Sequence, residues 1–429
     1  MRYAEAITRL YALSARGMRV GIERMQDGLA HRGLTPSALN VPFIQVAGTN
    51  GKGSVSSMLA SALRAAGYKT GLYSSPHLHR FTERVRIDGE PISTREAARR
   101  ISELLAWAEQ PGAPELSFFE LSTLLAVESF RDHRCDVAVI EVGLGGRLDA
   151  TTALPASLSV ITRIALDHEQ ILGNTLEQIA REKAGIIRPG VPVIAGARGA
   201  GVQRVIRARA RELGAKLFLI NRDFHATASR TTPAHVGFVV DGRRIPPLQL
   251  GLLGEHQRDN AAVAVAALAV LEDLGLPVSA AALRRGLRDV RWPARLERHN
   301  GRPALLFDAA HNPDGCEALA RYLARERKRP RVLVFGAMAD KNYQRMLEIL
   351  SKQVEQIVYV VPGIARAATH QQLQAAAPGA AAPSTGAALA RARAAAGSSG
   401  LVICAGSIFA VSELRAKALR LPSDPLIRM

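Results

Sequence analysis

Short apolar runs alternate with longer amphipathic stretches along this chain, and that alternation restricts the fold more than any other feature. The runs are bounded by turn residues and rich in β-branched side chains, which is typical of buried strands. In the first half they are VPFIQVAG (41–48), KTGLYSS (69–75), CDVAVIEVG (135–143), SLSVITRI (157–164) and VPVIAG (191–196). Helical patterns separate them at 54–66, 96–108, 120–131 and 175–187. This order predicts a mostly parallel sheet covered by helices on both faces.

A length of 429 residues predicts two or three domains, and the strand pattern favours two. After Trp292-Pro293 the α/β pattern resumes in ALLFDAA (304–310), RVLVFGA (331–337), QIVYVVPG (356–363) and LVICAGS (401–407). We expect a P-loop-type domain over 1–292 and a smaller Rossmann-like α/β domain over 293–429, with a cleft between them. Residues 197–255 break the α/β pattern, and we expect a small antiparallel excursion from the sheet there. A helix is expected over 260–274, and an Ala-rich helix and loop over 365–400.

Composition excludes several classes of protein. Hydrophobic residues make up 48% and charged residues 22%, as in ordinary globular domains. No apolar run is long enough to span a membrane, and the first residues lack the apolar core of a signal peptide. Cys135, Cys316 and Cys404 are too widely spaced to predict a disulfide framework or a zinc site. A reducing cytoplasm is therefore the expected compartment.

The net charge of +18 raises the question of nucleic-acid binding. The basic residues are mostly arginines spread along the whole chain among many alanines, and aromatic residues make up only 5%. Both features favour compositional bias over a docking surface, because base stacking needs aromatic platforms. We expect no nucleic-acid partner, although the field can still attract anionic small molecules.

The strand at 41–48 runs directly into Gly48-Thr49-Asn50-Gly51-Lys52-Gly53-Ser54 and then into a helix. Glycines let backbone N–H groups turn toward an anion, the helix N-terminus adds positive potential, and a lysine reaches the outer phosphates. The spacing departs from the common Walker A pattern, since two residues separate Gly48 from Gly51 and Gly53 follows Lys52. The segment predicts a phosphate loop, with a plain tight turn as the alternative.

Polar residues follow two strands at their carboxyl ends. Glu141 ends the strand at 135–143, and Asp167-His168 follow the strand at 157–164. In a parallel sheet these ends share one edge with the phosphate loop, so Glu141 is suited to hold Mg²⁺ beside ATP. The alternatives are an ion pair of Glu141 with Arg147 and a structural role for His168, since Mg²⁺ prefers oxygen ligands.

Two other motifs are ambiguous from the pattern alone. Lys183 lies beside Glu182 in a helical stretch, where a solvated helix face is the simplest interpretation. The segment Asp308-Ala309-Ala310-His311-Asn312-Pro313 follows an apolar run and is rich in polar groups. It predicts either a loop that points into the expected cleft or an Asx turn stopped by proline.

Taken together, the motifs resemble one family: folylpolyglutamate synthase and its bifunctional form with dihydrofolate synthase, within the Mur ligase superfamily. Each motif is weak alone, but they occur in the family's order over almost the whole chain. The matching segments are VAGTNGKGS (46–54), YSSPHL (73–78), ERVRIDG (83–89), FFEL (118–121), EVGLGGRLDATT (141–152), DHEQILGNTLEQIAREKAGIIRPG (167–190), LLGEHQRDNAAVA (252–264), WPARLE (292–297), DAAHNP (308–313), FGAMADKN (335–342) and AGSIF (405–409).

The resemblance implies an ATP-dependent ligase. ATP phosphorylates a carboxylate of dihydropteroate or of a reduced folate, and the amine of L-glutamate attacks the acyl phosphate to give an amide, ADP and phosphate. It also implies two Mg²⁺ ions, small-molecule substrates only, no membrane partner and a monomer. Cations at the phosphates would stabilise the developing charge, and binding both reactants together would remove an entropic barrier.

The resemblance also assigns roles by position. The ATP phosphates are assigned to Thr49, Asn50, Gly51, Lys52, Gly53 and Ser54. Mg²⁺ is assigned to Ser75, Glu141 and His168. The nucleotide is contacted from the side opposite the phosphate loop by Asn260, Arg295 and Asp308. The pterin site is lined by Gly21, Ile22, Phe118, Phe119, Glu120, Leu148, Asp149 and Ala150.

Glutamate is assigned to His311 and Ser407, and Lys183, His168 and His311 are the expected catalytic residues. Lys183 matches a lysine that family members carry as a carbamate, which would help to hold the second Mg²⁺. The chain departs from the family at Ala294, where glycine is usual, and Ala294 would restrict the backbone if φ there is positive.

Alternatives to the bifunctional enzyme remain open. The first is folylpolyglutamate synthase alone. YSSPHL and LDATT favour an enzyme that also uses dihydropteroate, but they do not settle the question. A cell-wall Mur ligase is a weaker alternative, against which SPHLHRFTERVRIDG (75–89) argues. A nucleic-acid-dependent P-loop ATPase is the alternative from another class, and the motif order does not predict it.

Overall fold

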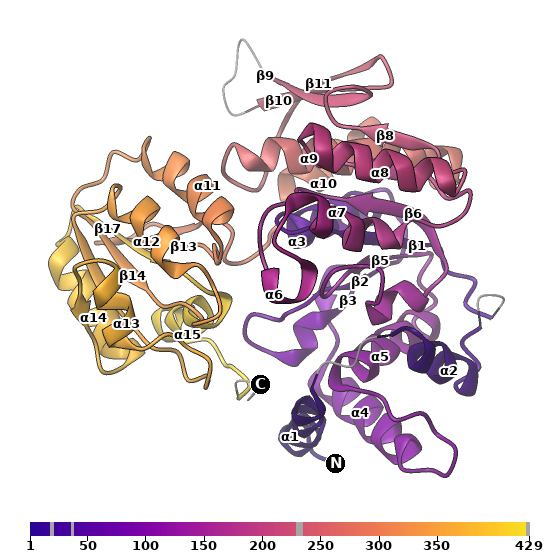
Figure 1. The fold of residues 1–429 in the computed structure, drawn as a ribbon, viewed down its shortest axis with the longest axis horizontal. Coiled ribbons are helices and arrows are strands. Elements are labelled where there is room, and N and C mark those ends of the chain that lie inside the picture. The colour runs from indigo at the N-terminus through magenta and orange to yellow at the C-terminus, as the bar shows by residue number, and fades with distance from the viewer. Residues whose placement is uncertain (18–20, 36–37, 229–234, 426–429) are drawn as a thin grey trace. The chain divides into compact units, whose positions relative to one another are not determined.

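The computed structural model describes residues 1–17, 21–35, 38–228 and 235–425 (Figure 1). It divides into two compact units. The first comprises Met1–His77, Phe81–Gly251 and Gln257–Arg291, and the second comprises Leu78–Arg80, Leu252–His256 and Trp292–Met429. Residues 229–234 of the expected excursion and 426–429 of the expected second domain lie outside the described part.

The first unit is built on a mostly parallel sheet in the order β4-β3-β2-β5-β1-β6-β7-β8. β1 is central and pairs in parallel with β5 on one side and β6 on the other, so the carboxyl ends of all three strands lie at one edge. The antiparallel pairings are those of β3 with β2 and with β4, at one end of the sheet. The strands are β1 Phe43–Ala47, β2 Thr70–Tyr73, β3 Val85–Ile87, β4 Glu90–Pro91, β5 Val137–Glu141, β6 Ala156–Ile161, β7 Val193–Ala195 and β8 Leu217–Leu219.

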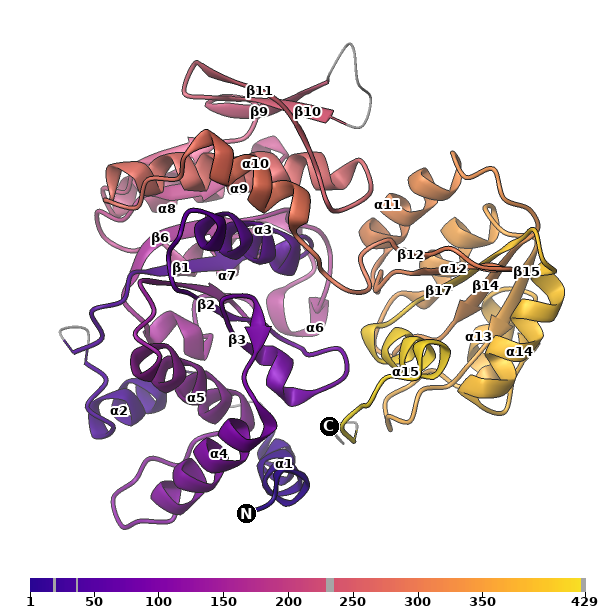
Figure 2. The same cartoon turned by 180° about the vertical axis from the view of Figure 1, so that it is seen from behind.

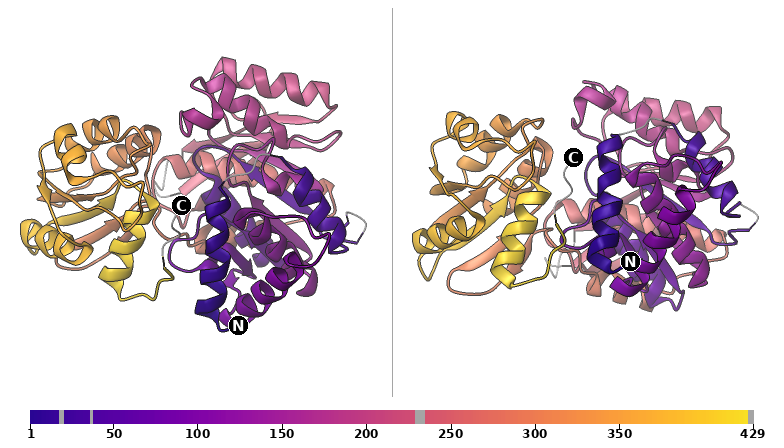
Figure 3. Two further views of the ribbon diagram at one scale, coloured as in Figure 1. Left: turned by 60° about the horizontal axis from the view of Figure 1, so that its bottom comes forward. Right: turned by 90° about the horizontal axis from the view of Figure 1, so that it is seen from below.

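Helices cover this sheet and bury its apolar side chains. α7 and α8 pack on the half formed by β6, β7 and β8, and α3 packs against β1, β2 and β5 with α10 at its side (Figure 2). The N-terminal helix α1, beside the N label in Figure 3, packs against α4. The α-helices of the first unit are α1 Tyr3–Ala12, α2 Glu23–His31, α3 Lys52–Ala65, α4 Thr94–Ala108, α5 Phe118–Asp132, α6 Glu169–Leu172, α7 Leu176–Lys183, α8 Ala200–Glu212, α9 His256–Asp273 and α10 Ala280–Asp289. The 3-10 helices are Leu13–Arg16, Phe81–Arg84, Ala150–Ala153 and Ala184–Ile186.

The expected break in the α/β pattern over 197–255 is wrong for its first part. α8 and β8 continue the alternation, and β8 pairs in parallel with β7. The basic, Ala-rich sequence of α8 hides its narrow apolar stripe, in which Val202, Ile206 and Ala210 are buried. The antiparallel excursion itself is confirmed as a three-stranded sheet, β9 Phe224–Ala228, β10 His235–Val240 and β11 Arg243–Gln249.

The second unit is a smaller α/β layer structure, and together the units confirm the expected fold class. Its sheet has the order β12-β13-β17-β14-β15-β16 and is parallel except for β12. α11, α12 and α13 cover one face and α14 and α15 the other, each with its own buried cluster. The strands are β12 Glu297–His299, β13 Ala304–Phe307, β14 Arg331–Phe335, β15 Gln356–Tyr359, β16 Ala380–Ala381 and β17 Leu401–Ala405. The helices are α11 Pro313–Leu323, α12 Tyr343–Ser351, α13 His370–Ala376, α14 Thr385–Ala396 and α15 Ile408–Leu419.

Within the described ranges, no helix is both long and apolar enough to cross a membrane. The Ala-rich region at 365–400 forms α13 and α14, as expected, but it also contributes the short edge strand β16. Because β16 has only two residues, its sequence carries no strand signal.

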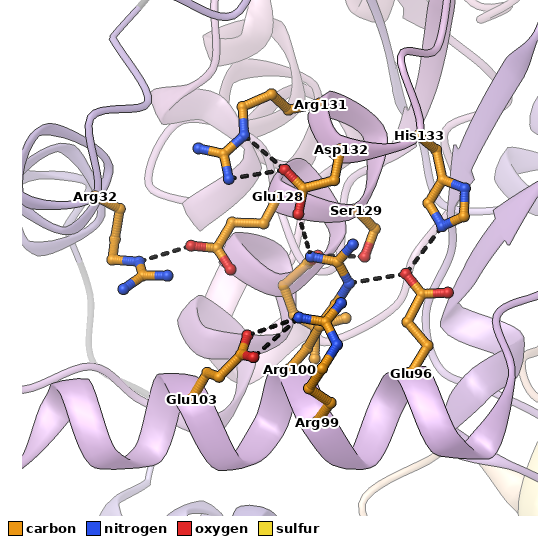
Figure 4. Close-up of polar contacts among 11 residues, drawn as sticks. Arg32, Glu96, Arg99, Arg100, Glu103, Glu128, Ser129, Arg131, Asp132 and His133 are labelled. Carbon is orange, nitrogen blue, oxygen red and sulfur yellow. Dashed lines mark hydrogen bonds and ion pairs between the residues drawn. The ribbon is translucent and has the colours of Figure 1, made fainter.

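A network of charged side chains joins α4 to α5 in the first unit (Figure 4). Arg100 lies at its centre with a side chain only 3% exposed, and it donates to Glu96 at 2.8 Å and to Asp132 at 2.9 Å. Glu96 also binds His133 at 2.9 Å. Burial would raise the pKa of Glu96, but the hydrogen bonds from Arg100 and His133 outweigh it and the pKa is lowered. The pairing therefore stabilises α4 against α5.

We expect Arg100→Met to lower the free energy of unfolding by about 2–3 kcal/mol, because it leaves Glu96 without its buried partner. The loss is smaller than for a fully buried pair, since the Asp132 side chain is 39% exposed. Arg99→Met is the matched control, because Arg99 pairs with Glu103 at the surface and should contribute less than about 1 kcal/mol. Urea denaturation measures both, and equal losses in the two variants would contradict the assignment.

Candidate active site

The loop between β1 and α3 needs glycine at two positions. Gly48 has φ +152° and Gly51 has φ +92°. A Cβ on Gly48 would lie 1.9 Å from the Thr162 hydroxyl oxygen, and one on Gly51 would lie 2.5 Å from Oδ1 of Asn260. Both the backbone conformation and the close packing therefore exclude larger residues.

The first half of this loop is tied to the segment that follows β6. The amides of Thr49 and Asn50 both donate to the Arg163 carbonyl, at 2.8 and 3.3 Å. The Thr49 hydroxyl donates to the Ala165 carbonyl at 3.0 Å and accepts from the Ala165 amide at 3.1 Å. The Thr162 hydroxyl donates to the Asn50 carbonyl at 2.8 Å. These bonds fix the loop before α3 begins.

The start of α3 is arranged to receive an anion. Gly51 is the N-cap residue, and no side chain caps the helix there. The first backbone N–H groups of α3 therefore have no intrahelical partner, and they carry the positive end of the helix dipole. Phosphate groups bind at such helix ends, which favours the phosphate-loop interpretation over a plain turn.

Two lysines converge on the Gly48 carbonyl. Lys52 Nζ donates to it at 3.1 Å and to the Thr49 carbonyl at 3.3 Å, while Lys183 Nζ donates to it at 2.9 Å. Lys183 is 4% exposed, so the solvated helix face suggested by its sequence is wrong. Burial, and then the charge of Lys52, lower the pKa of Lys183 to about 7. The neutral form of this amine is therefore populated near neutral pH.

The side chains expected to hold Mg²⁺ lie at or just after the ends of β2, β5 and β6, at the same sheet edge. Glu141 is the last residue of β5, is 6% exposed, and accepts from the Ser75 amide at 3.4 Å. His168 lies before α6 with φ +51°. Arg147 pairs with Glu182 at 3.0 Å, which contradicts the alternative pairing with Glu141.

This donor set suits Mg²⁺. In the described part of the chain, no group of three or more His, Cys, Asp or Glu side chains could enclose a metal. Mg²⁺ commonly binds one or two carboxylates and completes its shell with water and substrate phosphates, so Glu141 beside a phosphate loop fits that ion. Ser75 and Glu141 are brought together by the fold, and His168 shares their edge of the sheet.

Asn260 lies on α9 in the first unit, against the phosphate loop itself. It donates to Gln257 Oε1 at 2.9 Å, and Gln257 donates to the Ser54 hydroxyl at 3.3 Å. Its expected place on the side opposite the phosphate loop is therefore wrong. The chain returns to the first unit at Gln257 after an excursion of five residues, which the motif order does not reveal.

At the start of α5, Glu120, which is expected at the pterin site, already makes contacts that stabilise the fold. Ser117 and Glu120 form a capping box, and Glu120 also pairs with Arg24 of α2 at 3.2 Å. Gly21 and Ile22 immediately precede α2. The Arg24–Glu120 pair thus ties two of the expected pterin segments together, a role that the sequence analysis did not assign.

Asp149 lies in the loop after β5 and is 7% exposed. Its carboxylate accepts from the amides of Leu144 at 2.9 Å and Thr151 at 3.0 Å, and from the Thr151 hydroxyl at 2.6 Å. Burial raises its pKa against the opposing effect of these donors. Leu148 and Ala150 flank Asp149, and Ala150 begins a 3-10 helix. Phe119 lies across this loop, because a Cβ on Gly143 would meet its ring at 2.5 Å.

Sequence reasoning missed an aromatic cluster beside these segments. The Tyr11 and His77 rings stack with centroids 6.2 Å apart, and Tyr11 and Phe81 each meet Phe118 edge-on. Arg84 donates to His77 Nδ1 at 2.9 Å and lies 5.0 Å from the Phe118 ring centroid. The quoted SPHL motif contains His77, but its partners come from distant segments and leave no local signal.

In the second unit, Arg295 lies just before β12 and Asp308 lies just after β13. Asp308 follows β13, is 7% exposed, and accepts from the amides of Leu296 at 2.8 Å and Ala310 at 3.0 Å. Burial raises the pKa of Asp308, and the charge of Arg295 partly offsets that effect. Arg295 donates to the Ala294 carbonyl at 3.1 Å.

The two residues assigned to glutamate stand next to helix N-termini. Ser407 caps α15, and its neighbour Gly406 has φ +110°. His311 precedes Asn312, whose side chain caps α11, and His311 Nδ1 binds the Ala309 carbonyl at 2.9 Å. Pro313 is the first residue of α11, so it starts a helix where the sequence suggested a stop. Anionic ligands are favoured at such helix ends.

Known protein families and individual proteins are similar to this chain over most of its length. A family model described as the Mur ligase middle domain matches residues 46–268, and one described as the Mur ligase glutamate ligase domain matches residues 294–408. The Escherichia coli dihydrofolate synthase/folylpolyglutamate synthase is 37% identical over 372 residues, which are 86% of this chain and 84% of that protein. The Lacticaseibacillus casei folylpolyglutamate synthase is 36% identical over 333 residues, 76% of this chain and 78% of that protein.

Solved structures are similar over nearly the whole chain. The E. coli FolC protein in complex with DHPP and ADP has a TM-score of 0.87 and 34% identity, covering 98% of this chain and 99% of that one. A bifunctional folylpolyglutamate synthase/dihydrofolate synthase with Mn, AMPPNP and L-glutamate bound has a TM-score of 0.87 and 32% identity, covering 97% and 98%.

We expect Gly51→Ala to weaken the binding of an ATP analogue at least tenfold, equivalent to about 1.4 kcal/mol, because its Cβ meets Asn260 at the anion-facing end of α3. Gly67→Ala is the matched control, since Gly67 also has positive φ (+100°) but its Cβ would meet nothing within 4 Å. Calorimetric titration measures affinity, and thermal unfolding measures the backbone strain shared by both variants. Unchanged affinity in Gly51→Ala would refute the assignment of this loop.

Proposed function

Because the chain belongs to the folylpolyglutamate synthase/dihydrofolate synthase family of Mur ligases, we propose that it uses ATP to join L-glutamate to dihydropteroate and to reduced folates. The observation that carries the proposal is the phosphate loop, with an uncapped helix N-terminus and two lysines at the Gly48 carbonyl. It stands at the sheet edge that also presents Glu141.

The proposed reaction has two steps. An oxygen of the acceptor carboxylate takes the γ-phosphoryl group of ATP, and ADP leaves. The glutamate amine then attacks the carbonyl carbon of the acyl phosphate, and the tetrahedral intermediate expels phosphate as the amide forms. Phosphorylation replaces a poor leaving group with a good one, while the backbone N–H groups of the loop and Lys52 stabilise the phosphate oxygens.

Glu141, Ser75 and His168 are the residues we propose to hold Mg²⁺. When bound, the ion would neutralise charge on the phosphates of ATP. The remaining work falls to the chain itself, which orients the acceptor carboxylate and the glutamate amine so that the second step resembles a reaction within one molecule. His311 and Ser407 are the proposed glutamate contacts, and the segments at 21–22, 118–120 and 148–150 are the proposed pterin contacts.

Lys183 is the proposed site of a carbamate. Its neutral amine would attack CO₂, forming an N–C bond and releasing one proton, and would thereby become an anion. The buried position and the pKa of about 7 support this, because the neutral amine is the reactive form and predominates above that pH. A carboxylate there would remove the repulsion between Lys183 and Lys52 and add oxygen ligands for a second Mg²⁺.

The compartment and the oligomeric state are proposals of the same kind. All three cysteines are buried free thiols, and burial raises the pKa of each. That supports a reducing, cytoplasmic setting. The monomeric state stays a prediction.

Folylpolyglutamate synthase activity alone is the second candidate, favoured by the similarity to the L. casei protein of that name. The deciding experiment measures ADP release with ATP, Mg²⁺ and L-glutamate, using either dihydropteroate or tetrahydrofolate as acceptor. We expect turnover with both. Turnover with tetrahydrofolate only would establish the second candidate, and turnover with neither would refute the proposal. Lys52→Ala serves as the inactive control, because it removes the phosphate-facing cation.

We expect Lys183→Ala to lose at least about 100-fold in turnover and to regain part of it in acetate or formate, whose carboxylates can replace a carbamate. In the wild-type protein, ¹³CO₂ should give a carbamate resonance that is absent from the variant. Lys216→Ala, which alters an exposed lysine, is the control. Full activity in Lys183→Ala would remove the residue from the active site.

A further inference from the structure

A bidentate ion pair joins Glu297 of β12 to Arg415 of α15 within the second unit. Arg415 Nε donates to Glu297 Oε2 at 2.7 Å, and Nη2 donates to Oε1 at 2.8 Å. The side chains are 12% and 19% exposed, and paired, nearly parallel bonds of this kind fix both groups in direction as well as distance. Burial would raise the pKa of Glu297, but the bonds from Arg415, the Ala294 amide and His299 outweigh it and hold the pKa at about 2.

The ion pair holds a backbone segment that is strained. Ala294 has φ +57° and Leu296 has φ +46°, a conformation in which the Cβ of a non-glycine residue comes too close to the backbone. Both are 1% exposed. Arg295 stands between them, so its direction depends on whatever keeps its two neighbours in the left-handed conformation.

Three hydrogen bonds keep the segment in place. The Ala294 amide donates to Glu297 Oε2 at 2.9 Å, the same oxygen that Arg415 Nε binds. The Leu296 amide donates to Asp308 at 2.8 Å, and the Ala294 carbonyl accepts from the Ala309 amide at 2.9 Å. Without Arg415, the Glu297 carboxylate would lose its bidentate partner and would be held only by the Ala294 amide and by His299 Nε2 at 2.8 Å.

Arg415 is itself fixed by a second partner. Its Nη1 binds His79 Nε2 at 2.7 Å, and His79 is 8% exposed. Ser412, one turn earlier on α15, donates to the Leu78 carbonyl. The guanidinium thus has a partner for each of its nitrogens, which favours a single orientation over a mobile surface pair.

We propose that Arg415 and Glu297 are positioning residues for Arg295, the side chain that the family resemblance assigns to the nucleotide. The inference rests on the proposed function and deepens it: the ion pair acts through the Ala294 amide and touches no substrate. Its consequence is that Arg415 matters for nucleotide use only as long as Arg295 is present.

A double-mutant cycle on Arg415→Met and Arg295→Ala tests this dependence. We expect kcat/KM for ATP to fall at least tenfold in each single variant, and the double variant to fall no further than Arg295→Ala alone. Lys417→Met is the matched control, since Lys417 is an exposed cation on the same helix, and it should leave kcat/KM unchanged. A merely structural contribution of Arg415 would instead add to the loss in the double variant.

The same double-mutant cycle can be measured by calorimetry as the affinity for ADP, which requires no turnover. It therefore separates the positioning role of Arg415 from the proposed function. A wild-type protein that binds ADP but joins glutamate to no folate would overturn the proposed function alone. Additive losses, or unchanged kinetics and affinity in Arg415→Met, would overturn the positioning role. If Arg415→Met does not fold, Arg415→Lys takes its place, because it retains the charge but not the bidentate geometry. Additive losses or unchanged kinetics and affinity in that variant would likewise overturn the positioning role.

Discussion

The attachment of the loop at 48–50 to the segment at 162–165 is the contact on which the rest of the site depends. Five hydrogen bonds use the amides of Thr49 and Asn50, the Thr49 hydroxyl and the Asn50 carbonyl, so this half of the loop has little freedom left. β1 and β6 are adjacent and parallel, which places both segments at the same sheet edge. The following residues then enter α3 with their N–H groups unused by side chains. A helix end that no side chain caps, and that is therefore suited to an anion, is a direct result of that register.

This fixed loop also explains the unusual electrostatics. Two lysine ammonium groups share one carbonyl, Lys183 is buried, and its pKa is lowered to about 7 by burial and by Lys52. Nearby carboxylates, Asp167 and Asp149 among them, offset only part of that effect. The repulsion between Lys52 and Lys183 is reduced when a polyanion binds or when one amine becomes an anion. Both events belong to the proposed chemistry, and both relieve the same repulsion.

The sequence predicts those parts of the structure that have local signals. Apolar runs bounded by turns reveal β1, β5 and β17, and the glycine spacing reveals the phosphate loop, because strand burial and tight turns restrict neighbouring residues. Contacts between distant residues leave no such signal. The Arg24–Glu120 and Glu297–Arg415 pairs join segments about a hundred residues apart, and Asn260 returns to the phosphate loop only through tertiary packing. Family resemblance proposes roles for such residues, but the fold shows which side chains are already engaged in caps and ion pairs.

The central claim is that this chain activates a carboxylate by phosphorylating it, and transfer of an isotope tests that claim most directly. Dihydropteroate labelled with ¹⁸O in its carboxylate would be turned over with ATP and L-glutamate, and the released phosphate analysed by mass spectrometry. An acyl phosphate intermediate predicts one ¹⁸O atom in each phosphate released, because the bridging oxygen leaves with phosphorus. Unlabelled phosphate accompanying amide formation would contradict the account.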